Sequence, residues 1–198
     1  MTKYILQSGG LKNKPDSAKK YFKELFEGLG KEPKLLWCFF ATLPDDCNER
    51  FEKYTKLFEP FFPEGVKLIH KNATIENFEN EIREADAVYL HGGGIKPLYD
   101  ILNNYDVIEL FKDKNVGTNS ASSMVLAKYA WSCDERTPMD GLGIFPIKFL
   151  AHFKSDYGSD DPRGPIDWEK ARIELKQHKD KSLPIYSLEE GEYKIFKV

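Results

Sequence analysis

The sequence of 198 residues is 41% hydrophobic and 31% charged, which is ordinary for a globular protein and excludes a disordered chain. This length favours a single domain, which we expect to span residues 1–198. The net charge of −3 leaves no basic excess, so nucleic acid is not an expected partner.

Apolar runs alternate with amphipathic segments through the first 130 residues. The runs with the length and apolar content of strands are 4–10, 34–42, 65–70, 86–94 and 115–119. The segments with helical spacing of apolar residues are 18–29, 46–60, 74–84, 96–104, 106–114 and 121–130. This alternation predicts an α/β fold, a three-layer sandwich in which a mostly parallel sheet has helices on both faces.

The pattern becomes looser after residue 130. Turns and short apolar runs alternate up to residue 153, and a polar loop follows. Residues 167–178 predict a helix, and residues 183–198 predict two strands joined by a turn. In parallel sheets, ligands bind at the carboxyl ends of the strands, so residues that follow a strand are the first candidates for a site.

Ser120 lies in the stretch GTNSASSM (117–124), between a predicted strand and a predicted helix. A sharp strand-to-helix turn exposes a serine hydroxyl and directs N–H groups of the helix start toward the same space. The usual pattern has glycine two positions before and after the serine, where this chain has Thr118 and Ser122. Ser120 is thus either a nucleophile on a relaxed elbow or the cap of a helix rich in hydroxyl side chains.

The glycine run HGGG (91–94) ends the stretch DAVYLHGGG (86–94), a predicted strand that runs straight into glycines. Consecutive glycines let the backbone approach a ligand closely and present N–H groups to it. The run therefore predicts either half of an oxyanion hole or a tight turn into the next helix. Its position one βα unit before Ser120 favours the first interpretation.

Four histidines are candidates for a general base: His70, His91, His152 and His178. His152 follows a short apolar run in FLAHF, at an expected strand end, which suits a base beside Ser120. A serine–histidine pair also needs a carboxylate that holds the imidazole in the correct tautomer. The acids between Ser120 and His152 are Asp134, Glu135 and Asp140.

The remaining motifs point to no cofactor and no membrane. The sequence contains no HExxH, CxxC, P-loop or GxGxxG, so we expect neither a metal nor a cofactor. No apolar run approaches the roughly 20 residues that span a bilayer, and the run at the N-terminus is too short for a signal peptide. The three widely spaced cysteines, Cys38, Cys47 and Cys133, indicate reduced thiols and a cytoplasmic location.

Three stretches in this order resemble the dipeptidase E/cyanophycinase family of serine peptidases. They are AVYLHGGGIKPL (87–98), GTNSASSMVLA (117–127) and DGLGIFPIKFLAHF (140–153), of which the third is the most specific. SLPIYSLEEGEYKIFKV (182–198) is also similar to the family's P-x-x-x-L-x-E-G strand pair. The resemblance covers most of the chain and implies a fold like that of class I glutamine amidotransferases, which is flavodoxin-like.

The resemblance implies a role for each matching residue. Ser120 would be the nucleophile and His152 the base, and an acid about fifteen positions after the serine would complete the triad. Asp134 is the first candidate for this acid and Glu135 the second. The backbone N–H groups of Gly93 or Gly94 and of Ala121 would form the oxyanion hole.

The same resemblance implies a small, acidic peptide substrate. Known members cleave short peptides with an N-terminal aspartate or the β-aspartyl-arginine polymer cyanophycin, and Arg163 or Arg172 could bind the acidic group here. Ile95 replaces the usual asparagine after the glycines, and Thr118 and Ser122 replace the elbow glycines. The alternative is a catalytically impaired relative that binds a small acidic ligand or a partner in the same cleft. A homodimer is compatible with the sequence.

Overall fold

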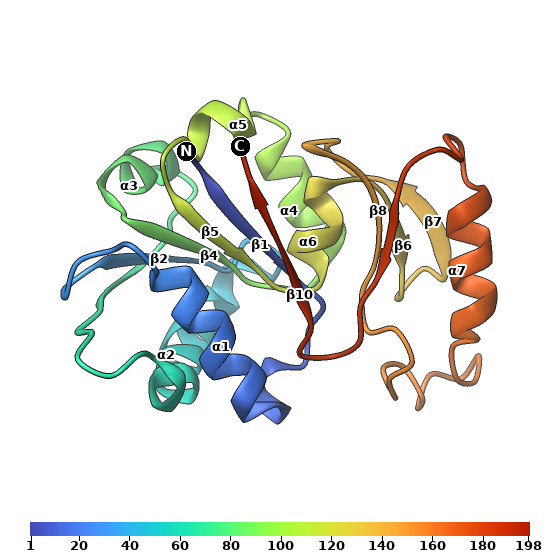
Figure 1. The fold of residues 1–198 in the computed structure, drawn as a ribbon, viewed down its shortest axis with the longest axis horizontal. Coiled ribbons are helices and arrows are strands. Elements are labelled where there is room, and N and C mark those ends of the chain that lie inside the picture. The colour runs from blue at the N-terminus through green and yellow to red at the C-terminus, as the bar shows by residue number, and fades with distance from the viewer.

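A six-stranded sheet forms the centre of the protein, whose structure is a computed structural model of residues 1–198. The strand order is β10-β1-β5-β4-β2-β3 (Figure 1). The bounds are β1 Lys3–Gln7, β2 Lys34–Cys38, β3 Ile69–Asn72, β4 Ala87–Leu90, β5 Asn115–Thr118 and β10 Tyr193–Lys197. Strands β1 to β5 are parallel, whereas β10 is antiparallel to β1.

Helices cover both faces of this sheet, which confirms the predicted sandwich. One face carries α1 (Pro15–Phe26) and α2 (Cys47–Phe58), and the other carries α3 (Phe78–Glu84), α4 (Ile95–Leu102), α5 (Val107–Leu110) and α6 (Ala121–Leu126). Three short 3-10 helices, η1 (Leu11–Asn13), η2 (Pro44–Asp46) and η3 (Glu59–Phe61), lie in the connections. In α1, Pro15 occupies the first turn, and the apolar residues three or four positions apart are all buried.

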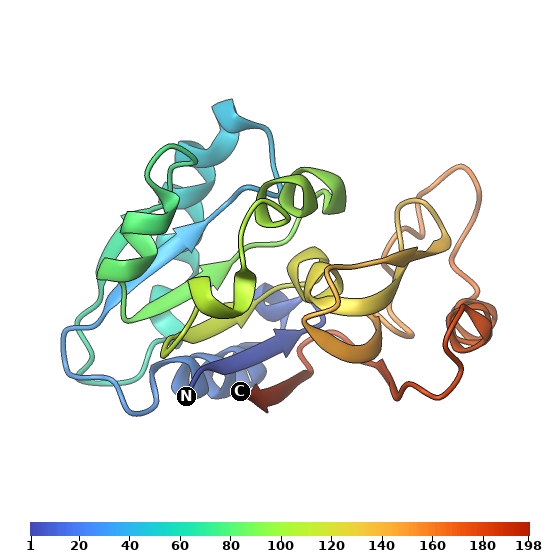
Figure 2. The ribbon, with the colours of Figure 1, turned by 90° about the horizontal axis from the view of Figure 1, so that it is seen from above.

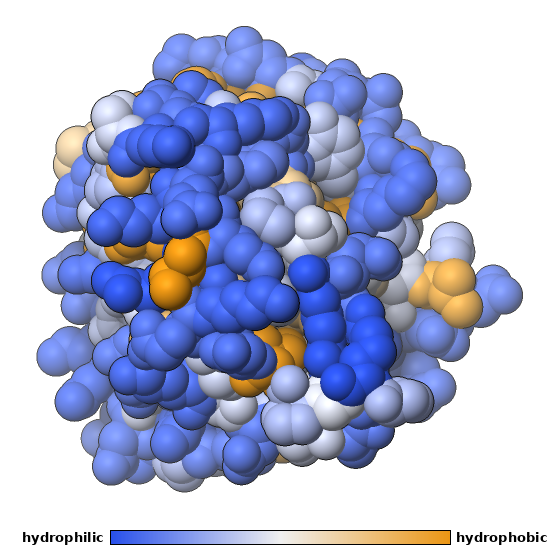
Figure 3. All heavy atoms as spheres, turned by 90° about the vertical axis from the view of Figure 1, so that its right-hand side faces the viewer, coloured by the Kyte–Doolittle hydropathy of each residue, from blue (hydrophilic) through white to orange (hydrophobic).

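A second, four-stranded sheet lies beside the first, and the sequence did not predict it. Its order is β7-β6-β8-β9, with bounds β6 Ala127–Ser132, β7 Thr137–Asp140, β8 Phe145–Leu150 and β9 Ile185–Ser187. Helix α7 (Trp168–Gln177) packs against it through a separate apolar cluster, at the end of the molecule farthest from β3 (Figure 2). The surface on that side is mostly hydrophilic (Figure 3). None of the helices has the length and apolar composition needed to cross a membrane.

Several predicted boundaries are wrong because tertiary partners override local propensity. The helix expected at 121–130 ends at Leu126, since 127–132 pairs with β7 and β8. The helix expected at 106–114 is limited to Val107–Leu110, and the strand expected at 65–70 begins at Ile69. The two C-terminal strands do not pair with each other, because β9 joins the second sheet and β10 the first. The turn between them thus connects the two sheets.

Candidate active site

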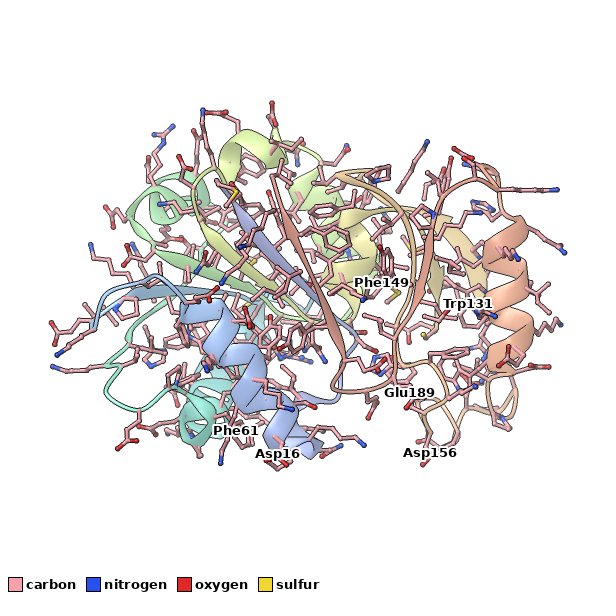
Figure 4. The ribbon with its side chains drawn as sticks, in the orientation of Figure 1. Asp16, Phe61, Trp131, Phe149, Asp156 and Glu189 are labelled. Carbon is pink, nitrogen blue, oxygen red and sulfur yellow. The ribbon has the colours of Figure 1, made fainter.

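A cavity of about 780 Å³ opens where the carboxyl ends of β1, β4 and β5 meet the second sheet. Its lining comes from segments far apart in the sequence: 9–14, one face of α2, 91–93, 119–120, Asp134, 152–157 and 189–190. Glu189 and Asp156, labelled in Figure 4, both belong to this lining. The predicted Ser120, His152 and glycine run therefore border one cavity, as expected for a site at strand ends.

Ser120 lies on a sharp turn between β5 and α6. Its backbone angles are φ 52° and ψ −104°, a conformation that non-glycine residues rarely adopt and that marks functional turns. The turn is held in place because the N–H of Ser120 donates to the carbonyl of Gln7, 2.8 Å away on the neighbouring strand. The Ser120 side chain makes no cap hydrogen bond to α6, so the helix-cap interpretation is wrong.

Hydroxyl side chains occupy the elbow positions where glycines are usual. Ser122 Oγ donates to the carbonyl of Leu90 (2.7 Å) and accepts from the N–H of Asn119 (2.8 Å). Thr118 Oγ1 bonds Ser123 Oγ, and both are completely buried. The polar side chains thus fit at this close approach because each finds buried partners on adjacent strands.

His152 follows β8 and places its ring beside Ser120. Nε2 of His152 lies 2.8 Å from Oγ of Ser120. The backbone of His152 has a left-handed φ of 56°, and its N–H donates to Oγ of Ser8 over 2.8 Å. Ser8 in turn donates to the carbonyl of Leu188 (2.7 Å), so the base is fixed to both β1 and the C-terminal segment.

The carboxylate beside His152 is Glu190. Its Oε1 lies 2.9 Å from Nδ1 of His152, and it belongs to the turn between β9 and β10. The expectation that Asp134 or Glu135 would bond this nitrogen is wrong. Asp134 accepts a hydrogen bond from the hydroxyl of Tyr157 instead, and Glu135 is exposed. Glu190 is the acid of the L-x-E-G stretch, which predicted only a strand pair.

Two glycines of the first βα turn allow this arrangement. A Cβ on Gly9 would lie 2.2 Å from Cε1 of His152, and one on Gly10 would lie 2.6 Å from Oε2 of Glu190. Both glycines also have positive φ angles of 120° and 76°. The sequence indicated a turn here but gave no sign that it touches the site.

Burial sets the protonation of His152. The residue is 6% exposed, and this desolvation lowers its pKa below the ordinary value of 6.5. Its hydrogen bond to Glu190, the charge of Glu190 and the charge of Asp134 oppose the shift. The net result is a histidine that is neutral at physiological pH, as a general base must be.

Three backbone N–H groups beside Ser120 have no hydrogen-bond partner within the protein: those of Gly92, Gly93 and Ala121. The N–H of Gly94 is different, because it donates to the carbonyl of Ala41 over 2.6 Å. Of the predicted oxyanion-hole residues, Gly93 and Ala121 therefore have a free donor and Gly94 has none. Only glycine fits at 93, since a Cβ would lie 2.3 Å from the Ala41 oxygen.

Neither predicted arginine lines the cavity. Arg163 pairs with Asp161 and donates to the carbonyl of Asp134, while Arg172 is exposed on α7. The cations that do line it are Lys12, Lys14, Arg50 and Lys154. They come from η1 and the residue after it, from α2 and from the loop after β8, and no motif in the sequence singles them out.

His91 also lines the cavity but has a different environment from His152. It is 4% exposed, packs between Phe39 and Tyr54, and bonds the carbonyl of Gly92 through Nδ1 at 2.7 Å. Burial lowers its pKa to about 4. His91 is therefore neutral, and its hydrogen bond goes to the backbone of Gly92 whereas that of the Ser120 hydroxyl goes to His152. No group of three or more histidine, cysteine or acidic side chains is arranged to hold a metal ion.

Comparison with known proteins gives the family. Two solved structures share the fold over the whole chain: a peptidase from an acI-B1 actinobacterium (TM-score 0.67, 17% identity, 84% of that chain covered) and a putative peptidase E protein from Listeria monocytogenes EGD-e (TM-score 0.60, 15% identity, 99% covered). No curated protein matches the sequence significantly. The model of peptidase family S51 matches residues 4–193. The chain therefore belongs to peptidase family S51, the dipeptidase E family of serine peptidases.

Proposed function

We propose that this peptidase cleaves short peptides with Ser120 as nucleophile, His152 as general base and Glu190 as the carboxylate that orients the base. The observation that supports this most directly is the pair of contacts at His152, 2.8 Å to Ser120 and 2.9 Å to Glu190. A carboxylate oxygen can only accept, so Nδ1 carries the ring proton. Nε2 then has its lone pair free to take the proton of the Ser120 hydroxyl.

The proposed reaction has two steps. Oγ of Ser120 bonds the carbonyl carbon of the substrate while its proton passes to Nε2 of His152, and the N–H groups of Gly93 and Ala121 stabilise the oxyanion. His152 then gives the proton to the leaving amine, the C–N bond breaks, and an acyl-enzyme remains. In the second step a water molecule, deprotonated by His152, releases the acid and restores the Ser120 hydroxyl.

The proposed substrate carries a carboxylate near the scissile bond, as a peptide with an N-terminal aspartate does. Lys12, Lys14 and Arg50 line the cavity together with the acids Asp134, Asp156, Glu189 and Glu190, and none of the three cations forms a salt bridge within the protein. Arg50 is half-buried and lies one helical turn before Tyr54, so both side chains face the cavity from the same side of α2. A half-buried guanidinium binds a carboxylate more strongly than an exposed lysine does.

Hydrolysis of matched dipeptides tests this proposal. We expect the wild type to cleave a peptide with N-terminal aspartate faster than its asparagine isostere. Arg50→Met raises KM for the aspartyl peptide by about tenfold or more, with a smaller effect on the asparaginyl peptide. Lys56→Met, an exposed change on the same helix outside the cavity, is the control. If Arg50→Met raises KM equally for the two peptides, the role of Arg50 is contradicted. If the wild type hydrolyses no short peptide at all, the proposed function is contradicted.

A further inference from the structure

The ring of Tyr157 covers one face of the His152 imidazole. The two ring centroids are 4.2 Å apart and the planes are inclined by 23°, which is a stacked arrangement. Tyr157 is itself 38% exposed, so it forms part of the cavity wall, between His152 and solvent. A large aromatic side chain at such an exposed position, in direct contact with the base, calls for a functional explanation.

Gly9 contacts the imidazole at its Cε1 atom, which lies between the two ring nitrogens. A Cβ at that position would overlap the His152 ring, so the backbone of Gly9 is in direct contact with it. Ser120 and Glu190 bond the two ring nitrogens within the ring plane. The imidazole is therefore held by hydrogen bonds at both ring nitrogens, by the backbone of Gly9 at Cε1 and by the stacked ring of Tyr157 on one face.

Tyr157 is fixed by its hydroxyl. The hydroxyl donates to Oδ1 of Asp134 over 2.9 Å, and Arg163 donates to the backbone carbonyl of the same Asp134 over 2.7 Å. The loop that carries Tyr157 is tied to α7, because Nε1 of Trp168 donates to the carbonyl of Ser155 (2.9 Å). The position of the stacked ring is thus fixed by the hydrogen bond of its hydroxyl and by the bond that holds its loop to α7.

We propose that Tyr157 is a positioning residue for the general base: its ring holds the His152 imidazole in line with Ser120 and excludes water from it, and Asp134 acts through the hydroxyl of Tyr157. This inference rests on the proposed role of His152 as the base. It also gives Asp134 a place in the site that differs from a triad carboxylate. Asp134 touches neither the imidazole nor Ser120, yet it fixes the group that covers the imidazole.

Tyr157 and Asp134 shift the pKa of His152 in opposite directions. Tyr157 contributes to the burial that lowers the pKa of His152, whereas the negative charge of Asp134 raises it, as does that of Glu190. Replacing Tyr157 by alanine admits water to the ring, so the pKa of His152 rises. Replacing Asp134 by asparagine removes a charge, so the same pKa falls. A residue that only stabilised the fold would move neither value.

The test combines steady-state kinetics with an NMR titration of the ¹⁵N-labelled imidazoles. The signals of His152 are identified as those missing from the spectrum of His152→Gln. We expect Tyr157→Ala to lose about tenfold or more in activity, mainly in kcat, because small misplacements of reacting groups are costly. Its acid limb in the pH profile moves to higher pH. Tyr157→Phe keeps the ring but loses its bond to Asp134, so its kcat lies between those of the wild type and Tyr157→Ala, and Asp134→Asn moves the His152 pKa to lower pH. Tyr105→Ala, which truncates a half-buried tyrosine packed on Phe78, is the control.

The inference is overturned if Tyr157→Ala, shown to be folded by circular dichroism, retains both the wild-type kcat and the wild-type titration of His152. It is also overturned if Tyr157→Phe is as impaired as Tyr157→Ala. Tyr157→Leu replaces the alanine variant if the latter does not fold, since it keeps apolar volume without a flat ring. Failure of the proposed function looks different: the wild type itself hydrolyses no peptide, while the NMR titration still reports whether Tyr157 covers His152.

Discussion

Nδ1 of His152 lies 2.9 Å from Oε1 of Glu190, a residue thirty-eight positions later in the chain. We expect Glu190→Gln to lower kcat by about 10²-fold or more, because the amide no longer secures the tautomer in which Nε2 accepts the Ser120 proton. Rates of peptide hydrolysis at saturating substrate measure this loss. The control is Glu135→Gln, which alters an exposed acid outside the triad and leaves kcat near the wild-type value. A lower kcat for Glu135→Gln than for Glu190→Gln would contradict the assignment of Glu190.

The oxyanion hole depends on the glycine at position 93. Gly93→Ala places a Cβ 2.3 Å from the carbonyl oxygen of Ala41, at a φ of 150° that disfavours side chains, so the N–H at 93 must move. We expect kcat to fall by about 10²-fold, as for the loss of one oxyanion donor. Gly30→Ala is the matched control, since a Cβ there meets nothing within 4 Å. An active Gly93→Ala enzyme would remove Gly93 from the mechanism.

The elbow is held by buried hydroxyl groups. Ser122→Ala removes the group that bridges the carbonyl of Leu90 and the N–H of Asn119, and leaves both without that partner. We expect the free energy of unfolding to fall by about 1–3 kcal/mol, measured by urea denaturation. Ser182→Ala changes an exposed serine after α7 and costs about 0.5 kcal/mol or less. Equal stability of Ser122→Ala and wild type would show that these bonds contribute nothing to the elbow.

His91 makes stability depend on pH. Its pKa in the folded protein is about 4 against an ordinary value of 6.5, because it is buried. Below pH 6.5 the unfolded chain binds a proton that the folded protein does not accept until about pH 4. The free energy of unfolding therefore falls over this range, by up to about 3 kcal/mol from this residue. His91→Phe should lose less stability between pH 7 and pH 4.5 than the wild type, and an unchanged pH dependence would contradict this attribution.

The site residues that could be predicted from the sequence are those marked by their immediate neighbours in the chain. Ser120 and the glycine run each follow an apolar strand directly, and His152 follows β8, so strand ends alone bring them together. The parallel sheet follows from the βα alternation for the same reason. Such features need no knowledge of distant contacts.

The site residues that could not be predicted from the sequence are placed by contacts between segments far apart in the chain. Glu190 reaches His152 only because β9 and β10 enter different sheets and because Gly9 and Gly10 leave room for both side chains. Asp134 has the right charge and sequence position for a triad, but Tyr157 lies between it and the imidazole. The direction of long side chains such as Arg163 is likewise decided by neighbours, here Asp161.

The central claim is that the Ser120 hydroxyl is activated by His152. Labelling with a fluorophosphonate, located by peptide mass spectrometry, tests it most directly. We expect one label per folded chain, on Ser120, with none in Ser120→Ala and more than about 10-fold slower labelling in His152→Gln. The control Ser182→Ala is labelled like the wild type. Failure of folded wild-type protein to react at Ser120, or equal reaction rates in the wild type and His152→Gln, would contradict it.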